Sequence, residues 1–139
     1  MNTSFFRVLT VCATVALVAS LRAEPALVGH KGFAGQTLDG EAVKAVLLGK
    51  KVTLGDTRVV IVIAKSGTEQ EQFLQQSVGM TTAQFQNHWR RLFMTGGGSA
   101  PKIVDSEAEA CKLAADTPGA IAIVDRAAGA GLAVLATGK

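Results

Sequence analysis

The chain has 139 residues, of which 48% are hydrophobic and 5% aromatic, enough for one domain around one core. Its 14 basic and 11 acidic side chains give a net charge of +3 without any long basic run. Lys50-Lys51 and Arg90-Arg91 are isolated pairs, which are typical of a solvated surface. Composition therefore argues against a nucleic-acid-binding protein.

Residues 1–23 have the pattern of a secretory signal peptide. Arg7 precedes an apolar run over residues 8–19, and small residues then lead to the polar Glu24. The run is shorter than the roughly 20 apolar residues that a membrane-spanning helix needs. We predict cleavage after Ala23, with Ala19 as the alternative site, and a periplasmic domain over residues 24–139 that has no membrane span. An uncleaved membrane anchor is the competing interpretation.

Removal of this segment changes the charge and cysteine arguments. Residues 1–23 hold Arg7, Arg22 and no acid, so the remainder has 12 basic and 11 acidic side chains, a net charge of +1. One cysteine remains, Cys111, which excludes an internal disulfide. Its helical spacing from Ala108 and Ala115 predicts a buried position.

The first half of the domain alternates strands and helices. A short strand is expected over 26–29, a helix over 38–49 and a polar turn region over 50–57. Asp39 is a suitable N-cap residue for that helix, and Gly49 is a residue type that commonly ends a helix. Residues 58–64 are β-branched and almost continuously apolar, which predicts a central strand buried on both faces.

The second half continues the alternation. A helix over 69–78 is followed by one over 83–94, whose apolar face holds Phe85, Trp89, Leu92 and Phe93. Ser106 and Glu109 match a capping box at the start of a further helix that ends near residue 115. Strands are expected over 102–104, 120–124 and 132–136. The pattern predicts an α/β fold with a mixed sheet.

The best candidate for a binding site is the loop Lys65-Ser66-Gly67-Thr68, between the strand 58–64 and the next helix. Backbone N–H groups at a helix N-terminus, two hydroxyls and Lys65 form a plausible cradle for a small anion. The alternative is that Ser66 or Thr68 only caps the helix. Glu69 and Glu71 favour that alternative, because they complement the helix dipole themselves and would repel an anion.

Other chemistry finds little support in the sequence. His30 and His88 are far apart and lack the spacing of a metal site. Ser66 is not in a Gly-x-Ser-x-Gly elbow, and no base is indicated for Cys111. The loop at 96–98 follows a helix and is expected to end it. We therefore expect no enzyme, no metal and no cofactor.

Short pieces of sequence between residues 42 and 124 follow one another in a set order. They are Leu48-Gly49-Lys50, Gly55-Asp56, the strand 59–63, Phe73, Val78-Gly79, Trp89, Phe93-Met94-Thr95-Gly96, Pro101, Ser106 and Pro118-Gly119-Ala120-Ile121. In this order the chain resembles the periplasmic phosphate-binding proteins of ABC transporters, and in particular their short relatives of single-lobe size.

The resemblance implies a three-layer lobe of the periplasmic-binding-protein type 2 fold, with a mixed sheet flanked by helices. It also implies that loop 65–68 binds phosphate or a similar oxyanion for an ABC permease. Family members carry an arginine four residues before Ser-Gly-Thr, where this chain has Val62. The alternative function is therefore a reduced lobe without ligand that acts through protein contacts or as a homodimer in the cell envelope.

Overall fold

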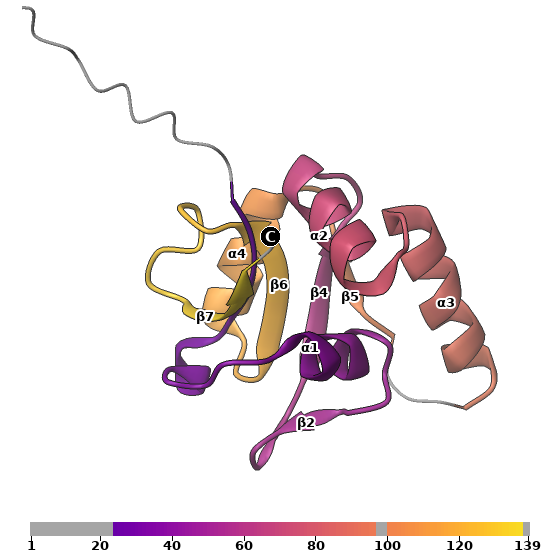
Figure 1. Ribbon diagram of the computed structural model, residues 1–139, viewed down its shortest axis with the longest axis horizontal. Coiled ribbons are helices and arrows are strands. Elements are labelled where there is room, and N and C mark those ends of the chain that lie inside the picture. Colours follow the sequence, from indigo (N-terminus) through magenta and orange to yellow (C-terminus); the bar gives the residue numbers. More distant parts are fainter. Residues whose placement is uncertain (1–23, 97–99, 138–139) are drawn as a thin grey trace, which may run out of the picture.

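A computed structural model describes residues 24–96 and 100–137, and they form a sheet with helices on both sides (Figure 1). The predicted signal peptide lies outside these residues. The strands are β1 (Pro25–Gly29), β2 (Thr53–Leu54), β3 (Thr57–Arg58), β4 (Val60–Ala64), β5 (Lys102–Val104), β6 (Ala120–Asp125) and β7 (Ala133–Thr137). The helices are α1 (Gly40–Leu47), α2 (Thr68–Val78), α3 (Thr82–Met94) and α4 (Glu107–Asp116), with a 3₁₀ turn, η1 (Lys31–Phe33).

Five strands form the central sheet in the order β5-β4-β6-β1-β7. β4 runs parallel to β5 and β6, with Ile61 opposite Ile121. β1 runs antiparallel to β6 and β7, with Leu27 opposite Ile123, so the sheet is mixed. Because β4 and β6 lie inside the sheet, both read as continuous apolar runs.

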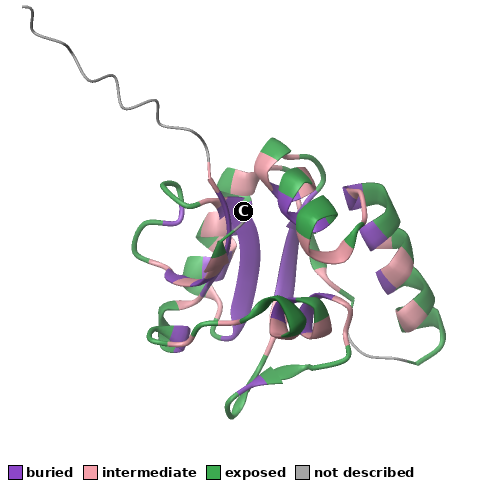
Figure 2. Ribbon diagram, in the orientation of Figure 1, coloured by how far each residue is buried: buried purple, intermediate pink, exposed green. Residues whose placement is uncertain are grey.

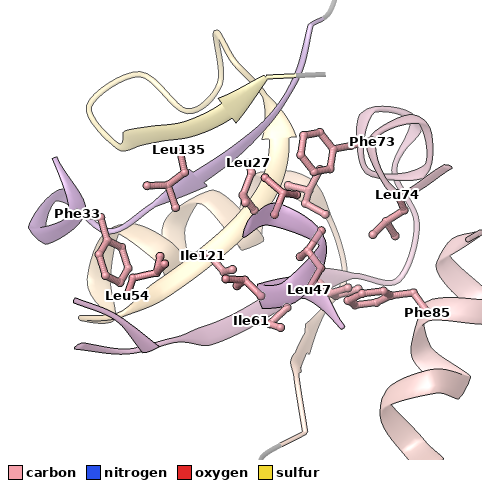
Figure 3. Close-up of a cluster of buried hydrophobic side chains, with 14 of the residues drawn as sticks. Leu27, Phe33, Leu47, Leu54, Ile61, Phe73, Leu74, Phe85, Ile121 and Leu135 are labelled. Carbon is pink, nitrogen blue, oxygen red and sulfur yellow. The ribbon is translucent and has the colours of Figure 1, made fainter. Parts of the chain in front are cut away.

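The two faces of the sheet carry different cores. On one face, large side chains of the sheet pack against α1, α2 and α3, as Figure 3 shows for Leu27, Leu47, Phe73 and others. On the other face, Ala110 and Ala114 of α4 pack against small side chains such as Val62. Small residues let α4 lie close to the strands. The result is the three-layer α/β fold with a mixed sheet flanked by helices that the sequence predicted.

Local signals place most element ends correctly. The Asp39 side chain accepts from the N–H of Ala42 at the start of α1, and Gly49 takes a φ of 82° just after its end. Thr81 and Gln84 form a reciprocal capping box at the start of α3. The Ser106 hydroxyl accepts from the N–H of Glu109 as expected, but the Glu109 carboxylate accepts from the N–H of Asp105 rather than from that of Ser106, so the expected capping box is half formed. These contacts depend only on neighbours in sequence.

Two expectations were wrong in detail. The polar region 50–57 holds the strands of a small hairpin, β2 and β3, and Arg58 belongs to that hairpin rather than to β4. Phe93, expected on the buried face of α3, is 58% exposed, whereas Phe85 and Trp89 are buried. The cause is position, because α3 lies at the β5 edge of the sheet and only part of its apolar face meets the core (Figures 1 and 2).

None of the described helices combines the length and the apolar content that crossing a membrane requires.

Candidate functional site

The loop Lys65-Ser66-Gly67 joins the carboxyl end of β4 to the first residue of α2, as the sequence predicted. In open α/β sheets, ligands bind beyond the carboxyl ends of parallel strands. The loop and Thr68 line an open groove of about 850 Å³ between the first turns of α2 and α3. Its other walls are polar, with Glu71, Gln72 and Thr81 among them.

The α2 N-terminus is not capped by the residues that the sequence offered. Gly67 is the N-cap residue, with an extended φ of 171°, and no side chain of its own turn bonds the helix. The interpretation of Ser66 or Thr68 as a helix cap is therefore wrong. Among the described residues, the N–H groups of Ser66, Thr68 and Glu69 have no hydrogen-bond partner.

A carboxyl group from another helix reaches this terminus instead. Oε1 of Glu107, the first residue of α4, accepts from the N–H of Gln70 at 2.8 Å. The same carboxyl group lies against Gly67 so closely that a Cβ there would overlap it. A glycine is thus needed at position 67 for the Glu107 side chain to lie this close to the start of α2. The Glu107 carboxyl group also occupies part of the position that a bound anion would take.

The charge of Glu107 changes close to neutral pH. Burial raises the pKa of its carboxyl group to about 7, against the hydrogen bond from Gln70, which lowers it. The Glu69 carboxyl group and the negative charge of Asp125 raise it further. The α2 N-terminus therefore faces a carboxyl group that gains its negative charge as the pH rises through the neutral range.

Lys65 lies at the rim of the site rather than inside the loop. Its Nζ is 2.8 Å from Oδ1 of Asp105, which follows β5, and both side chains are exposed. This contact raises the pKa of Lys65 and lowers the pKa of Asp105. Exposed pairs of this kind exchange readily with other partners. Lys65 can reach an anion only by leaving Asp105.

Hydrogen bonds of Glu71 and Gln70 hold together the elements that surround the groove. Glu71 accepts from the N–H and the hydroxyl of Thr82, which joins α2 to the start of α3 and lowers the pKa of Glu71. The fully buried Gln70 side chain accepts from the N–H of Ala64 and donates to its C=O, at 2.9 and 2.8 Å. Sequence reasoning missed Gln70 and Glu107 because no local pattern marks their partners.

The remaining candidate residues have structural roles. Val62, at the position of the family's arginine, is buried beneath α4. His30 accepts from the N–H of Gly32, and His88 bonds the carbonyl of Leu48. Cys111 is half-buried rather than fully buried, and burial raises the pKa of its thiol. Within residues 24–96 and 100–137, no three His, Cys, Asp or Glu side chains gather as a metal site.

Comparison with known proteins identifies the fold. No family model and no curated protein matches the chain. A solved structure from Clostridium perfringens, assigned as a phosphate ABC transporter substrate-binding protein with bound phosphate, matches with a TM-score of 0.59. The fold is that of a periplasmic-binding-protein-like lobe. Identity is 17%, and the match covers 81% of this chain but 44% of that protein, so the chain spans less than half of its length.

Proposed function

We propose that this protein is an exported, non-enzymatic solute-binding domain that captures phosphate or a similar small oxyanion at Lys65, Ser66, Gly67 and Thr68. The observation that carries the proposal is the strand–loop–helix unit that opens on a polar groove at the carboxyl end of β4. Unpartnered N–H groups of Thr68 and Glu69 and the hydroxyls of Ser66 and Thr68 supply donors to an anion there.

The role in uptake follows from the fold comparison. The matching solved protein is named as a component of an ABC transporter, so we propose a periplasmic location and delivery to an ABC permease. The match covers 44% of that protein, so we propose that the second wall of a closed site is supplied from outside residues 24–137. A second copy of the chain is one source of that wall.

Titration calorimetry tests the proposal directly. Phosphate is expected to bind the purified protein with micromolar affinity at low salt, and Ser66→Ala and Thr68→Ala are expected to abolish the heat without loss of fold. Ser77→Ala is the matched control, since Ser77 lies at the far end of α2. Absence of heat up to millimolar phosphate, or equal binding by Ser66→Ala, would exclude a receptor built on this loop.

The Glu107 carboxyl group predicts how this binding depends on pH. Since its charge appears as the pH rises through about 7, it opposes an anion at the α2 N-terminus above that pH. Sulfate is the better probe, because its charge does not change in this range. Sulfate affinity is expected to fall between about pH 6 and about pH 8. Glu107→Gln is expected to remove that fall.

A second function is favoured by the same residue. Glu107 already bonds Gln70 at the α2 N-terminus, and Val62 provides no charge for a ligand. Both observations fit a reduced lobe without ligand that acts through protein contacts in the cell envelope. That function predicts no calorimetric heat with oxyanions and silent Ser66→Ala and Thr68→Ala variants.

A further inference from the structure

Some large hydrophobic side chains are exposed, and two of them line a hollow at one edge of the sheet. In the part of the chain that the structure describes, the exposed ones are Val52, Phe93, Met94 and Ile103, which are 48%, 58%, 79% and 53% exposed. Phe93 of α3 and Ile103 of β5 line one hollow of about 210 Å³. We name this hollow the β5–α3 groove, and its apolar walls are Ile63, Phe85, Trp89, Phe93, Pro101 and Ile103.

The groove runs beside an open sheet edge. β5 is the last strand of the order β5-β4-β6-β1-β7 and pairs with β4 on one side. No described strand pairs with its other side, and α3 lies at this edge over the face of the sheet that carries Ile63 and Ile103 (Figure 1). An edge strand of this kind offers unpaired backbone groups to an added strand. Alternate side chains of that strand would point toward the groove.

The charged side chains that line the groove and the hollow beside it are all basic. Arg90 lines the groove, and Lys51 lines a smaller hollow that shares Trp89 and Ala100 with it. Lys102 lies on β5 itself. No Asp or Glu lines either hollow, and none of these three cations is in an ion pair with a described residue. Electrostatic complementarity therefore favours a partner that carries carboxylates.

We propose that the β5–α3 groove binds an extended acidic segment of another protein, which adds a strand to β5 and places an apolar side chain between Phe93 and Ile103. The volume of 210 Å³ fits a side-chain anchor, since small-molecule pockets usually measure about 300–1,000 Å³. A second copy is disfavoured because pairing of two β5 strands would bring the Lys102 and Arg90 side chains of both copies together. The proposal does not depend on anion binding at loop 65–68.

Trp89, the only tryptophan of the chain, lines the groove and reports its occupancy. The test adds a short blocked peptide that alternates valine with glutamate to the purified protein, and follows Trp89 emission. The comparison is a peptide of equal length that alternates valine with lysine. We expect a saturable change with the acidic peptide alone. Arg90→Glu and Ile103→Lys are each expected to weaken binding about tenfold or more.

Lys112→Glu is the matched control for Arg90→Glu, because Lys112 is an exposed cation of α4 on the opposite face of the sheet. It changes the net charge equally and is expected to leave the affinity unchanged. The proposal is overturned by equal affinity for the two peptides, or by no saturable change up to millimolar acidic peptide. Sedimentation that shows a dimer dissociated by Ile103→Lys would also overturn it, since a second copy would then cover the groove.

Discussion

At the scale of single residues, the contact between Gly67 and Glu107 determines what the α2 N-terminus can bind. The φ of 171° at Gly67 is open to any residue, so the glycine is required by space rather than by backbone conformation. A Cβ at this position would overlap the Glu107 side chain. It would lie 2.6 Å from the carboxyl carbon Cδ and 2.7 Å from Cγ. The glycine therefore allows one helix to lie against the end of another.

Gly67→Ala is expected to lower the free energy of unfolding, because the methyl group displaces Glu107 from the N–H of Gln70. In a Glu107→Ala background the same substitution is expected to cost much less, since the obstacle is gone. Urea denaturation of the two single variants and the double variant measures the coupling. Equal costs of Gly67→Ala in both backgrounds would contradict the contact.

Glu107→Gln is expected to change how stability depends on pH. The ordinary pKa of a glutamate is 4.5 and that of folded Glu107 is about 7, so between these values the folded state holds a proton that the unfolded chain has released. The free energy of unfolding therefore falls as the pH rises through this window and levels off above it. The glutamine does not titrate and can still accept from Gln70.

The measurement is urea denaturation across that pH range, followed by Trp89 fluorescence. Relative to Glu107→Gln, the wild type is expected to lose stability between about pH 4.5 and about 7. Glu41→Gln, which removes an exposed acid of α1, is the control and is expected to leave the wild-type profile unchanged. Parallel profiles for the wild type and Glu107→Gln would show that the carboxyl group has no raised pKa.

The sequence predicted residues whose partners are close along the chain and missed those whose partners are distant. Asp39 and Ser106 bond N–H groups three residues away, and both were identified. Glu107 bonds a residue 37 positions away, and the Glu71 partner is 11 away on another helix. Such contacts depend on how helices pack, which local pattern does not contain. The sequence predicted the position of loop 65–68 but not that the Glu107 carboxyl group lies against it.

At the scale of elements, the end of β4 is held by the side chain of Gln70 as well as by its pairing with β5. Gln70 is fully buried and bonds both backbone groups of Ala64. Gln70→Leu would leave those two groups without partners in the core. We expect a cost of about 1–3 kcal/mol for each unpaired group. Gln76→Leu, an exposed position on the same helix, is expected to cost little.

Chemical denaturation compares the two glutamine variants, and hydrogen exchange locates the effect. Faster exchange is expected at the Ala64 N–H in Gln70→Leu, because this N–H then lacks an acceptor. If Gln70→Leu and Gln76→Leu were equally stable, the Gln70 side chain would not hold the strand end. The sequence predicted α2 over residues 69–78 but did not single out Gln70 among its glutamines, because glutamine is mostly an exposed residue.

At the scale of the whole molecule, the class of fold was predictable but the strand order was not. Alternating strands and helices indicated a mixed sheet, and the structure has one. Nothing in the apolar runs of β1 and β7 indicated that β1 lies between β6 and β7 and runs antiparallel to both. Side chains alternate along a strand with the same two-residue period whether the strand is parallel or antiparallel, and whichever strand lies beside it. The exposed position of Phe93 follows from that order, because β5 lies at the edge.

We predict that the protein is exported and that its mature chain begins at Glu24. β1 begins at Pro25, and the N–H of Glu24 lies 3.2 Å from Oδ1 of Asp125, while the Glu24 carboxylate lies 3.5 Å from Arg126. Cleavage after Ala23 would leave β1 complete and place a charged amino group beside the Asp125 carboxylate. N-terminal sequencing and intact mass of the exported protein are expected to show a start at Glu24. A start at Ser20 would indicate cleavage after Ala19, and a retained Met1 would exclude a cleaved signal peptide.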